Sequence, residues 1–292
     1  MHHRLALLTT ILAAAAMAHP ARADDPLFDS GRLRGTAGVA AIEGAAGGGT
    51  VPWAAIAGYG TGDAIGGTAH VTAIRLSDFK LASAGVNAGF YNRLELSYTR
   101  IAIDTGRAGQ GLGIGRGTTI RMDVFGAKLR LLGDIVYGPA WLPQVAAGFQ
   151  YKANDRGSLL AAFGARSHQG ADLYASATKL LLGQSVLLNA TIRLTRANQA
   201  GLLGFGGPGG NSYRPALEGS VAWLPSRTVA LGAEVRTMPN ALHSTRSSPW
   251  VDVFIAWFPT KTVSATLAYV DLGTVATRKH QSGVQISAQM GF

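Results

Sequence analysis

The sequence predicts an all-β protein, a transmembrane antiparallel up-and-down β-barrel of about 14 strands whose two chain ends lie on the same side. Three observations predict it. Apolar residues recur with a period of two, connections alternate between short and long, and a Trp-x-Pro turn recurs at one set of chain reversals. After residue 23 there is no run of about 18 apolar residues, the length that a spanning helix needs.

The N-terminus has the three parts of an export signal. Met1 to Arg4 is basic, Leu5 to Met17 is a short apolar run, and Ala21-Arg22-Ala23 is a small-x-small cleavage site. A retained anchor is the alternative, but the run is shorter than a spanning helix. We therefore expect cleavage after Ala23, a periplasmic segment at 24–34 and a barrel at 35–292.

Composition agrees with strands that have only one apolar face. Gly accounts for 39 of 292 residues, charged residues are only 14%, and the absence of cysteine excludes disulfides and a thiol-linked lipid anchor. The formal net charge is +10, and removing Arg4 and Arg22 with the signal leaves 24 − 16 = +8. A basic exported chain fits an acidic solute, a nucleic acid or a membrane surface, and the positions of the charges must decide among them.

Alternation locates the strands. In the last segment Val284, Ile286 and Met290 share one face, while Gln285 and Gln289 share the other. The first two segments are rich in Ala and Gly, so the alternative is a barrel of 12 strands with an N-terminal segment folded inward. The expected strands are 35–44, 51–60, 66–77, 80–90, 93–104, 117–132, 144–153, 170–182, 185–196, 213–224, 228–238, 249–258, 262–272 and 281–292.

One strand changes phase in its middle. Ile120 and Val124 share a face, but beyond Gly126 the apolar positions change parity to Leu129 and Leu131. A one-residue bulge at Gly126 would restore the phase, and glycines often mark such bulges.

The turns and the C-terminus favour a membrane barrel over a soluble sandwich. Trp223-Leu224-Pro225 reappears as Trp257-Phe258-Pro259, and Trp141-Leu142-Pro143 is a partial third copy. Caps on a soluble core are the alternative, but indoles at one rim are typical of an aromatic girdle. A last strand ending in an aromatic residue is the signal that barrel-assembly machinery recognises. The expected girdle is Trp141, Trp223, Trp257 and Phe292.

The chain also resembles a known family. Residues 42–49, Ile-Glu-Gly-Ala-Ala-Gly-Gly-Gly, continue through Val51-Pro52-Trp53-Ala54 to Gly58-Tyr59-Gly60-Thr61. This stretch, together with the Gly-rich segment 197–207, is similar to a proteobacterial family known as domain of unknown function 3034. The resemblance implies an outer-membrane setting in a Gram-negative bacterium and carries over no activity.

Charged residues on the polar strand faces should point inward, because a basic residue facing mid-bilayer hydrocarbon costs about 2–4 kcal/mol. They would either line a wet pore or brace a filled lumen. The candidate lumen-lining residues are Glu95, Arg121, Asp123, Lys128, Arg130, Arg193, Glu218, Glu234, Arg236 and Asp252.

Other basic residues fall in predicted external loops or strand tops, where phosphorylated lipopolysaccharide would attract them. Nothing resembles an aromatic-interleaved nucleic-acid platform, so no nucleic-acid partner is expected. This set is Arg107, Arg116, Lys152, Arg156, Arg166, Arg196, Arg246, Arg278 and Lys279.

Motifs for catalysis or metal binding are absent from the sequence. There is no G-x-S-x-G elbow and no H-E-x-x-H pair, and the histidines after residue 23 are widely separated, with only His70 placed on a strand. We expect no cofactor, no metal and no enzymatic activity. The leading hypothesis is passive passage of small solutes. A non-transporting barrel that binds lipid or protein is the alternative, and a lipid-modifying enzyme a third.

Overall fold

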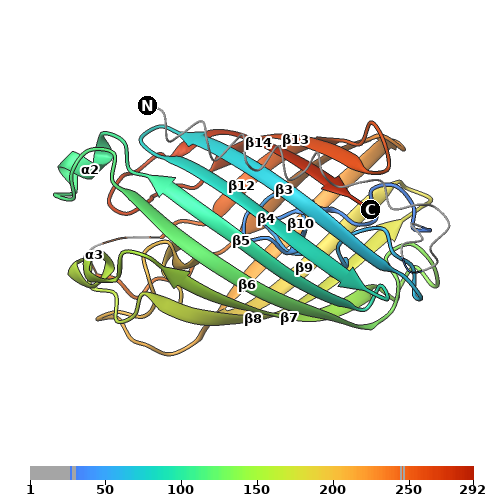
Figure 1. The fold of residues 1–292 in the computed structure, drawn as a ribbon, viewed down its shortest axis with the longest axis horizontal. Helices are drawn as coiled ribbons and strands as arrows, with labels where there is room; N and C mark the ends of the chain where they lie inside the picture. Colours follow the sequence, from blue (N-terminus) through green and yellow to red (C-terminus); the bar gives the residue numbers. More distant parts are fainter. Residues whose placement is uncertain (1–26, 28–30, 244, 246) are drawn as a thin grey trace.

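The computed structural model describes residues 27, 31–243, 245 and 247–292. Twelve strands, β3 to β14, form a closed antiparallel barrel in which chain neighbours pair and β14 pairs with β3 (Figure 1). The predicted fold class is therefore confirmed. The predicted cleavage at Ala23 lies outside the described residues. The barrel strands are β3 (Ile65–Leu76), β4 (Lys80–Phe90), β5 (Leu94–Asp104), β6 (Thr119–Leu132), β7 (Gln144–Asn154), β8 (Gln169–Leu181), β9 (Val186–Thr195), β10 (Arg214–Ser226), β11 (Val229–Arg236), β12 (Trp250–Trp257), β13 (Val263–Asp271) and β14 (Ser282–Gly291).

The strand number corrects the 14-strand prediction in favour of the 12-strand alternative. The expected strands 35–44 and 51–60 do not join the barrel. In their place, β1 (Val39–Ala40) and β2 (Ala46–Gly47) form a two-stranded sheet of their own. The physical reason is side-chain size, because an Ala/Gly-rich segment offers little surface to hydrocarbon but fits inside a narrow barrel.

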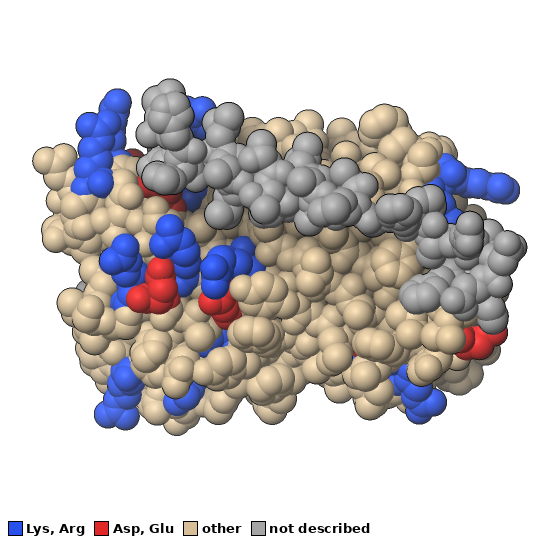
Figure 2. Space-filling model, in the orientation of Figure 1, with Lys and Arg blue, Asp and Glu red and all other residues tan. Residues whose placement is uncertain are grey.

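The outside of the barrel is apolar across its middle. Along β12 buried and exposed residues alternate strictly, and Val253, Ile255, Leu267 and Ile286 are half or more exposed on the outer face. Figure 2 shows charged side chains toward the two ends of the visible face and an uncharged band between them. Such a band is the surface that a barrel presents to hydrocarbon.

The two ends of the barrel differ. One end carries most of the long connections, with helices α2 (Ala108–Gly111) and α3 (Gly157–Ala162) and the 3₁₀ turn η2 (Gln199–Gly201), and the C-terminus lies at the other end (Figure 1). At the long-loop end only the β3–β4 connection, residues 77–79, is short. Within the described residues, no helix is both long and apolar enough to cross a membrane.

The predicted bulge at Gly126 is wrong. Pairing of β5 with β6 runs without a shift from Leu94 opposite Leu129 to Asp104 opposite Thr119. The apolar residues above Gly126, including Met122, therefore face into the barrel, where they pack in the buried core beneath the long loops. From Thr119 to Leu129 the strand keeps its phase, and its one register shift, against β7, lies between Arg130 and Leu132. Its environment changes from a polar lumen below to an apolar core above.

Candidate functional site

The lumen is filled by the N-terminal part of the chain. Every residue from 37 to 60 is buried, and we call this stretch the inner segment. Its only charged residue is Glu43. Small side chains allow the segment to run close to the wall. At Gly48, for example, a Cβ would lie 1.8 Å from Glu234 Oε1.

The inner segment is fastened where it enters the barrel. The guanidinium of Arg32 donates hydrogen bonds to the carbonyl oxygens of Ile56 (2.7 Å) and Gly58 (3.0 Å), and Tyr59 N donates to Phe292 O at 2.8 Å. Burial lowers the pKa of Arg32 to about 10, so this side chain is still charged at neutral pH. The entrance is thus tied directly to the end of the last strand.

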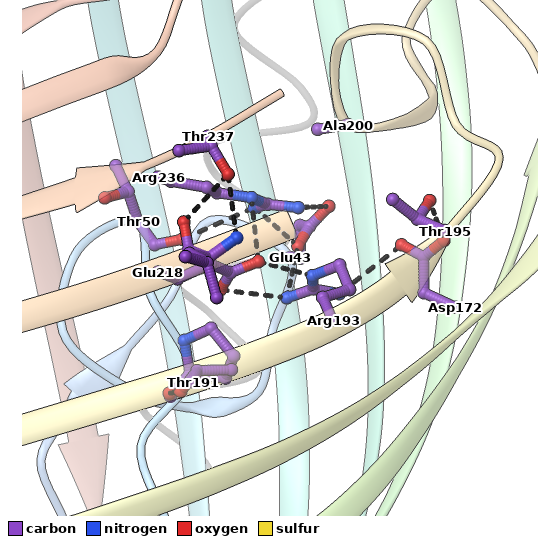
Figure 3. Close-up of polar contacts among 12 residues, drawn as sticks. Glu43, Thr50, Asp172, Thr191, Arg193, Thr195, Ala200, Glu218, Arg236 and Thr237 are labelled. Atoms are coloured by element: carbon purple, nitrogen blue, oxygen red, sulfur yellow. Dashed lines mark hydrogen bonds and ion pairs between the residues drawn. The ribbon is translucent and has the colours of Figure 1, made fainter. Parts of the chain in front are cut away.

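A buried ion network holds the middle of the inner segment (Figure 3). Glu43 lies between three wall cations. It pairs with Lys152, lies 2.8 Å from Arg236 Nη1 and lies 3.6 Å from Arg193 Nη2. The same cations also pair with wall carboxylates, Lys152 with Asp172 at 2.6 Å and Arg236 with Glu218 at 3.2 Å. Three acids and three bases, each at most 2% exposed, therefore balance in charge.

The ionisation of Glu43 depends on these neighbours. Burial by itself raises the pKa of its carboxyl, but Arg236, Lys152 and Arg193 lower it by more, so the pKa lies well below the ordinary 4.5. A lowered pKa contributes stability above the unfolded value, and the contribution is lost only as pH falls through the folded value. The network should therefore hold at neutral pH and down through pH 5.

A second ion pair holds the β1–β2 hairpin. Lys128 Nζ lies 3.2 Å from Glu95 Oε2. Glu95 accepts hydrogen bonds from the backbone N–H groups of Ala46 and Ala57, and Lys128 donates to the carbonyl oxygens of Ala46 and Trp53. Because Glu95 and Lys128 both bond to backbone atoms of the inner segment, they can fix its orientation even though its side chains are small.

The turn at residues 50–54 is bonded to several other strands. Trp53 Nε1 donates to Ser220 Oγ on β10 at 2.9 Å, and Ala54 N donates to Thr178 Oγ1 on β8 at 2.8 Å. Two pockets inside the described barrel, one beside Phe79 and one beside Arg193, each have room for about one water molecule. Neither pocket has room for a larger solute.

Most predicted lumen residues lie on the inner wall. Arg130 also points inward, but it is half-buried at the short-turn end and pairs with Asp134 at 3.0 Å. The inward and buried residues are Glu95, Lys128, Arg193, Glu218, Glu234, Arg236 and Asp252.

The inward placement of Arg121 and Asp123 is corrected. Both lie on the outer face near the long-loop end, where Asp123 pairs with Arg100 at 2.7 Å and Arg121 with Asp155 at 3.4 Å. At this level charged side chains face outward and pair with one another, while apolar side chains of the same strand enter the core.

Sequence reasoning missed three members of the central network. Lys152 was expected at an external strand top, but it is fully buried. Asp172 lies on a strand whose alternation is irregular. Glu43 carried a usable signal, since it is the one charge in a long Ala/Gly-rich stretch. Arg246, from the predicted external set, lies outside the described residues.

The four aromatic residues predicted as a girdle are all exposed near the short-turn end. Trp223 and Trp257 project outward from β10 and β12, Trp141 lies in the 133–143 loop, and Phe292 ends the chain. Contact with a membrane interface remains a prediction for these residues.

His70 does not assemble a hydrolytic site. Its Nε2 lies 3.3 Å from Thr99 Oγ1, and its Nδ1 has no partner among the described residues, so no acid orients the imidazole. Nor do the described residues bring together three or more His, Asp or Glu side chains in an arrangement for a metal ion.

The closed antiparallel barrel, its apolar outer band and its polar lumen define the class as an outer-membrane β-barrel. The chain belongs to the family described as "Protein of unknown function (DUF3034)", whose model matches residues 36–289. No curated protein matches the chain.

Solved outer-membrane barrels share the fold. The KdgM porin is 10% identical, with a TM-score of 0.50 over 77% of this chain and 99% of its own. The NanC porin is 9% identical (TM-score 0.47; 77% and 98% covered), and outer membrane phospholipase A from Escherichia coli is 10% identical (0.45; 76% and 92%). At such identities the likeness concerns the fold alone.

Proposed function

We propose that the protein is an outer-membrane channel for small solutes that rests closed, with the inner segment as its plug. The observation that carries this proposal is the chemistry of the contact between plug and wall. Each of the twelve barrel strands contributes a buried polar or charged side chain to the inner wall. Hydrogen bonds to such a wall can be exchanged for water at a net cost of about 0.5–1.5 kcal/mol each.

A purely structural core would not need this polar wall. If the inner segment withdrew, the wall would be a wet, charged surface inside a barrel of twelve strands. The alternative is a non-transporting barrel that binds lipid or protein. It is favoured by the ion network around Glu43, which fastens the segment to strands on one side of the lumen.

A reversible lock tests the proposal, because the chain has no cysteine of its own. Ala54 N on the plug donates a hydrogen bond to Thr178 Oγ1 on β8, so we choose these two positions for a cysteine pair whose cross-linking is verified by mass spectrometry before recording. In planar bilayers we expect the oxidised Ala54→Cys/Thr178→Cys variant to be silent and to regain wild-type openings when reduced. Each single-cysteine variant is the control. Openings that persist in a fully cross-linked sample would rule out the inner segment as the plug.

We also propose that lipopolysaccharide binds the outer wall beside the long loops, in addition to recognition of the C-terminal strand by assembly machinery. Arg75, Lys80, Arg100 and Arg121 are exposed on the outer face of β3 to β6, where Arg75 is directly opposite Lys80. Cations at this level meet the phosphates of the outer leaflet.

Lipopolysaccharide should therefore raise the melting temperature of the refolded barrel in detergent, and changing these four residues to Gln should abolish the rise. Arg227→Gln, at the short-turn rim, is the matched control and should keep the wild-type response. An equal rise in the fourfold variant would show that the outer patch does not bind the lipid.

A further inference from the structure

The carboxylate of Glu43 is held by the wall in the way that a protein holds a small carboxylate ligand. Arg236 presents two nitrogens to it side by side, with Nη1 2.8 Å from Oε2 and Nη2 3.2 Å from Oε1. Lys152 Nζ also donates to Oε1, and Arg193 Nη2 lies 3.6 Å from Oε2. A guanidinium that binds through two parallel N–H groups matches the planar shape of a carboxylate. Each carboxylate oxygen thus meets two cationic groups.

The wall builds this site from charges that alternate around the barrel (Figure 3). Five consecutive strands, β7 to β11, each contribute one buried side chain to it, base and acid in turn. Without Glu43 these side chains comprise three bases and two acids, so the wall carries one positive charge in excess. In strand order they are Lys152, Asp172, Arg193, Glu218 and Arg236.

Partners on the wall hold the cations of this site independently of Glu43. In addition to the pairs with Asp172 and Glu218, Arg193 Nη1 donates a hydrogen bond to Gln150 Oε1 at 2.8 Å. The Arg193 guanidinium also lies 5.2 Å from the centre of the Tyr174 ring. All of these partners lie on barrel strands. The site should therefore keep its arrangement when the inner segment leaves.

The excess charge determines which ligand fits the vacated site. A buried charge without a counter-ion is costly, so withdrawal of Glu43 favours binding of another anion. An anion with one charge would restore the neutrality that Glu43 provides. An anion with two charges would leave negative charge in excess beside Asp172 and Glu218.

We propose that Lys152, Arg193 and Arg236 form a binding site for the carboxylate group of a small monovalent organic acid, and that Glu43 occupies this site while the inner segment is seated. The inference rests on the proposed channel function and names the class of solute. Because the acid and Glu43 need the same cations, the acid stabilises only the open state. At ten times its dissociation constant, it should raise the ratio of open to closed barrels by about tenfold.

Glu43→Ala tests the binding site without requiring a current. The substitution removes a group with the shape of an acetate ion, so sodium acetate should raise the melting temperature of the refolded variant in detergent and reach saturation. Sodium chloride at equal ionic strength and uncharged acetamide should have no such effect. Wild-type protein should show no rise specific to acetate, because Glu43 fills the site.

Two double variants show whether the response belongs to this site. Glu43→Ala/Arg236→Gln should lose the response to acetate. Glu43→Ala/Lys179→Gln is the matched control and should keep it, because Lys179 is also a buried wall base but donates to the carbonyl oxygens of Asp134 and Tyr137. Equal responses of the two double variants, or no response of Glu43→Ala, would overturn the inference.

Bilayer recording separates this inference from the channel function. Acetate should raise the open probability of wild-type protein. It should also reduce the single-channel current of Glu43→Gln in KCl, because it binds the vacated site within the lumen, and sulfate should reduce that current less. Current in neither protein would refute the channel itself. A Glu43→Gln current that acetate leaves unchanged, or that sulfate blocks equally, would refute only the monocarboxylate site.

Discussion

Glu43→Gln should convert the resting barrel into one that is open far more often. The substitution keeps the shape of the side chain but leaves Lys152, Arg193 and Arg236 with an uncompensated buried charge. Breaking a buried ion pair by neutralising one partner costs about 3–5 kcal/mol. If that cost falls on the seated state alone, the open population rises by roughly 10²–10⁴-fold. Single-channel recording measures the effect as open probability.

Two comparisons make this result specific. Asp63→Asn removes one negative charge from a fully exposed residue just outside the inner segment and should leave the open probability unchanged. Wild-type protein at pH 5 should also remain closed, because the pKa of Glu43 is held below its ordinary value. A Glu43→Gln protein that behaves like wild type would show that the network does not hold the plug.

Ile286→Arg should destabilise the folded barrel by about 2–4 kcal/mol, the cost of a basic residue on the lipid face near the midplane. Ile286 is 61% exposed on the outer face of β14, between Leu267 and Ala73 on the neighbouring strands. Reversible unfolding by urea in lipid vesicles measures the free energy of unfolding.

The control places the same side chain at the edge of the barrel. Leu182 is 60% exposed in the β8–β9 turn, so Leu182→Arg should cost only about 0–1 kcal/mol near an interface. Equal effects of the two substitutions would contradict an outer face in hydrocarbon, as would wild-type protein that stays monomeric and soluble without detergent.

Strand positions were predictable because burial of one face of a strand produces an alternation of apolar and polar residues in the local sequence. The last segment was expected at 281–292 and is a strand at Ser282–Gly291, and 80–90 agrees with β4 at both ends. The short turns and the Trp-x-Pro repeats could be predicted for the same reason, since each depends on a few consecutive residues. These features needed no knowledge of distant contacts.

The alternation of apolar and polar residues gave wrong placements where the surroundings of a strand changed along its length, although the strand itself continued. It placed Arg121 and Asp123 inside because it assumed a polar lumen along the whole of β6. The upper lumen is in fact an apolar core made by loops, and these two residues pair on the outside with Asp155 and Arg100. Parity assigns residues to two faces, but only the packed structure shows what each face meets.

The site depended on long-range contacts. Glu43 bonds to Lys152 and Arg236, which lie 109 and 193 residues away in the chain, and nothing in their local patterns links them. The linear order of residues alone specified the barrel, its strands and its apolar outer band, because a period of two is a property of neighbouring residues. The filling of the lumen was decided by the folded chain, because the inner segment is held by charged residues that are far apart in the sequence and are brought together only in the closed barrel.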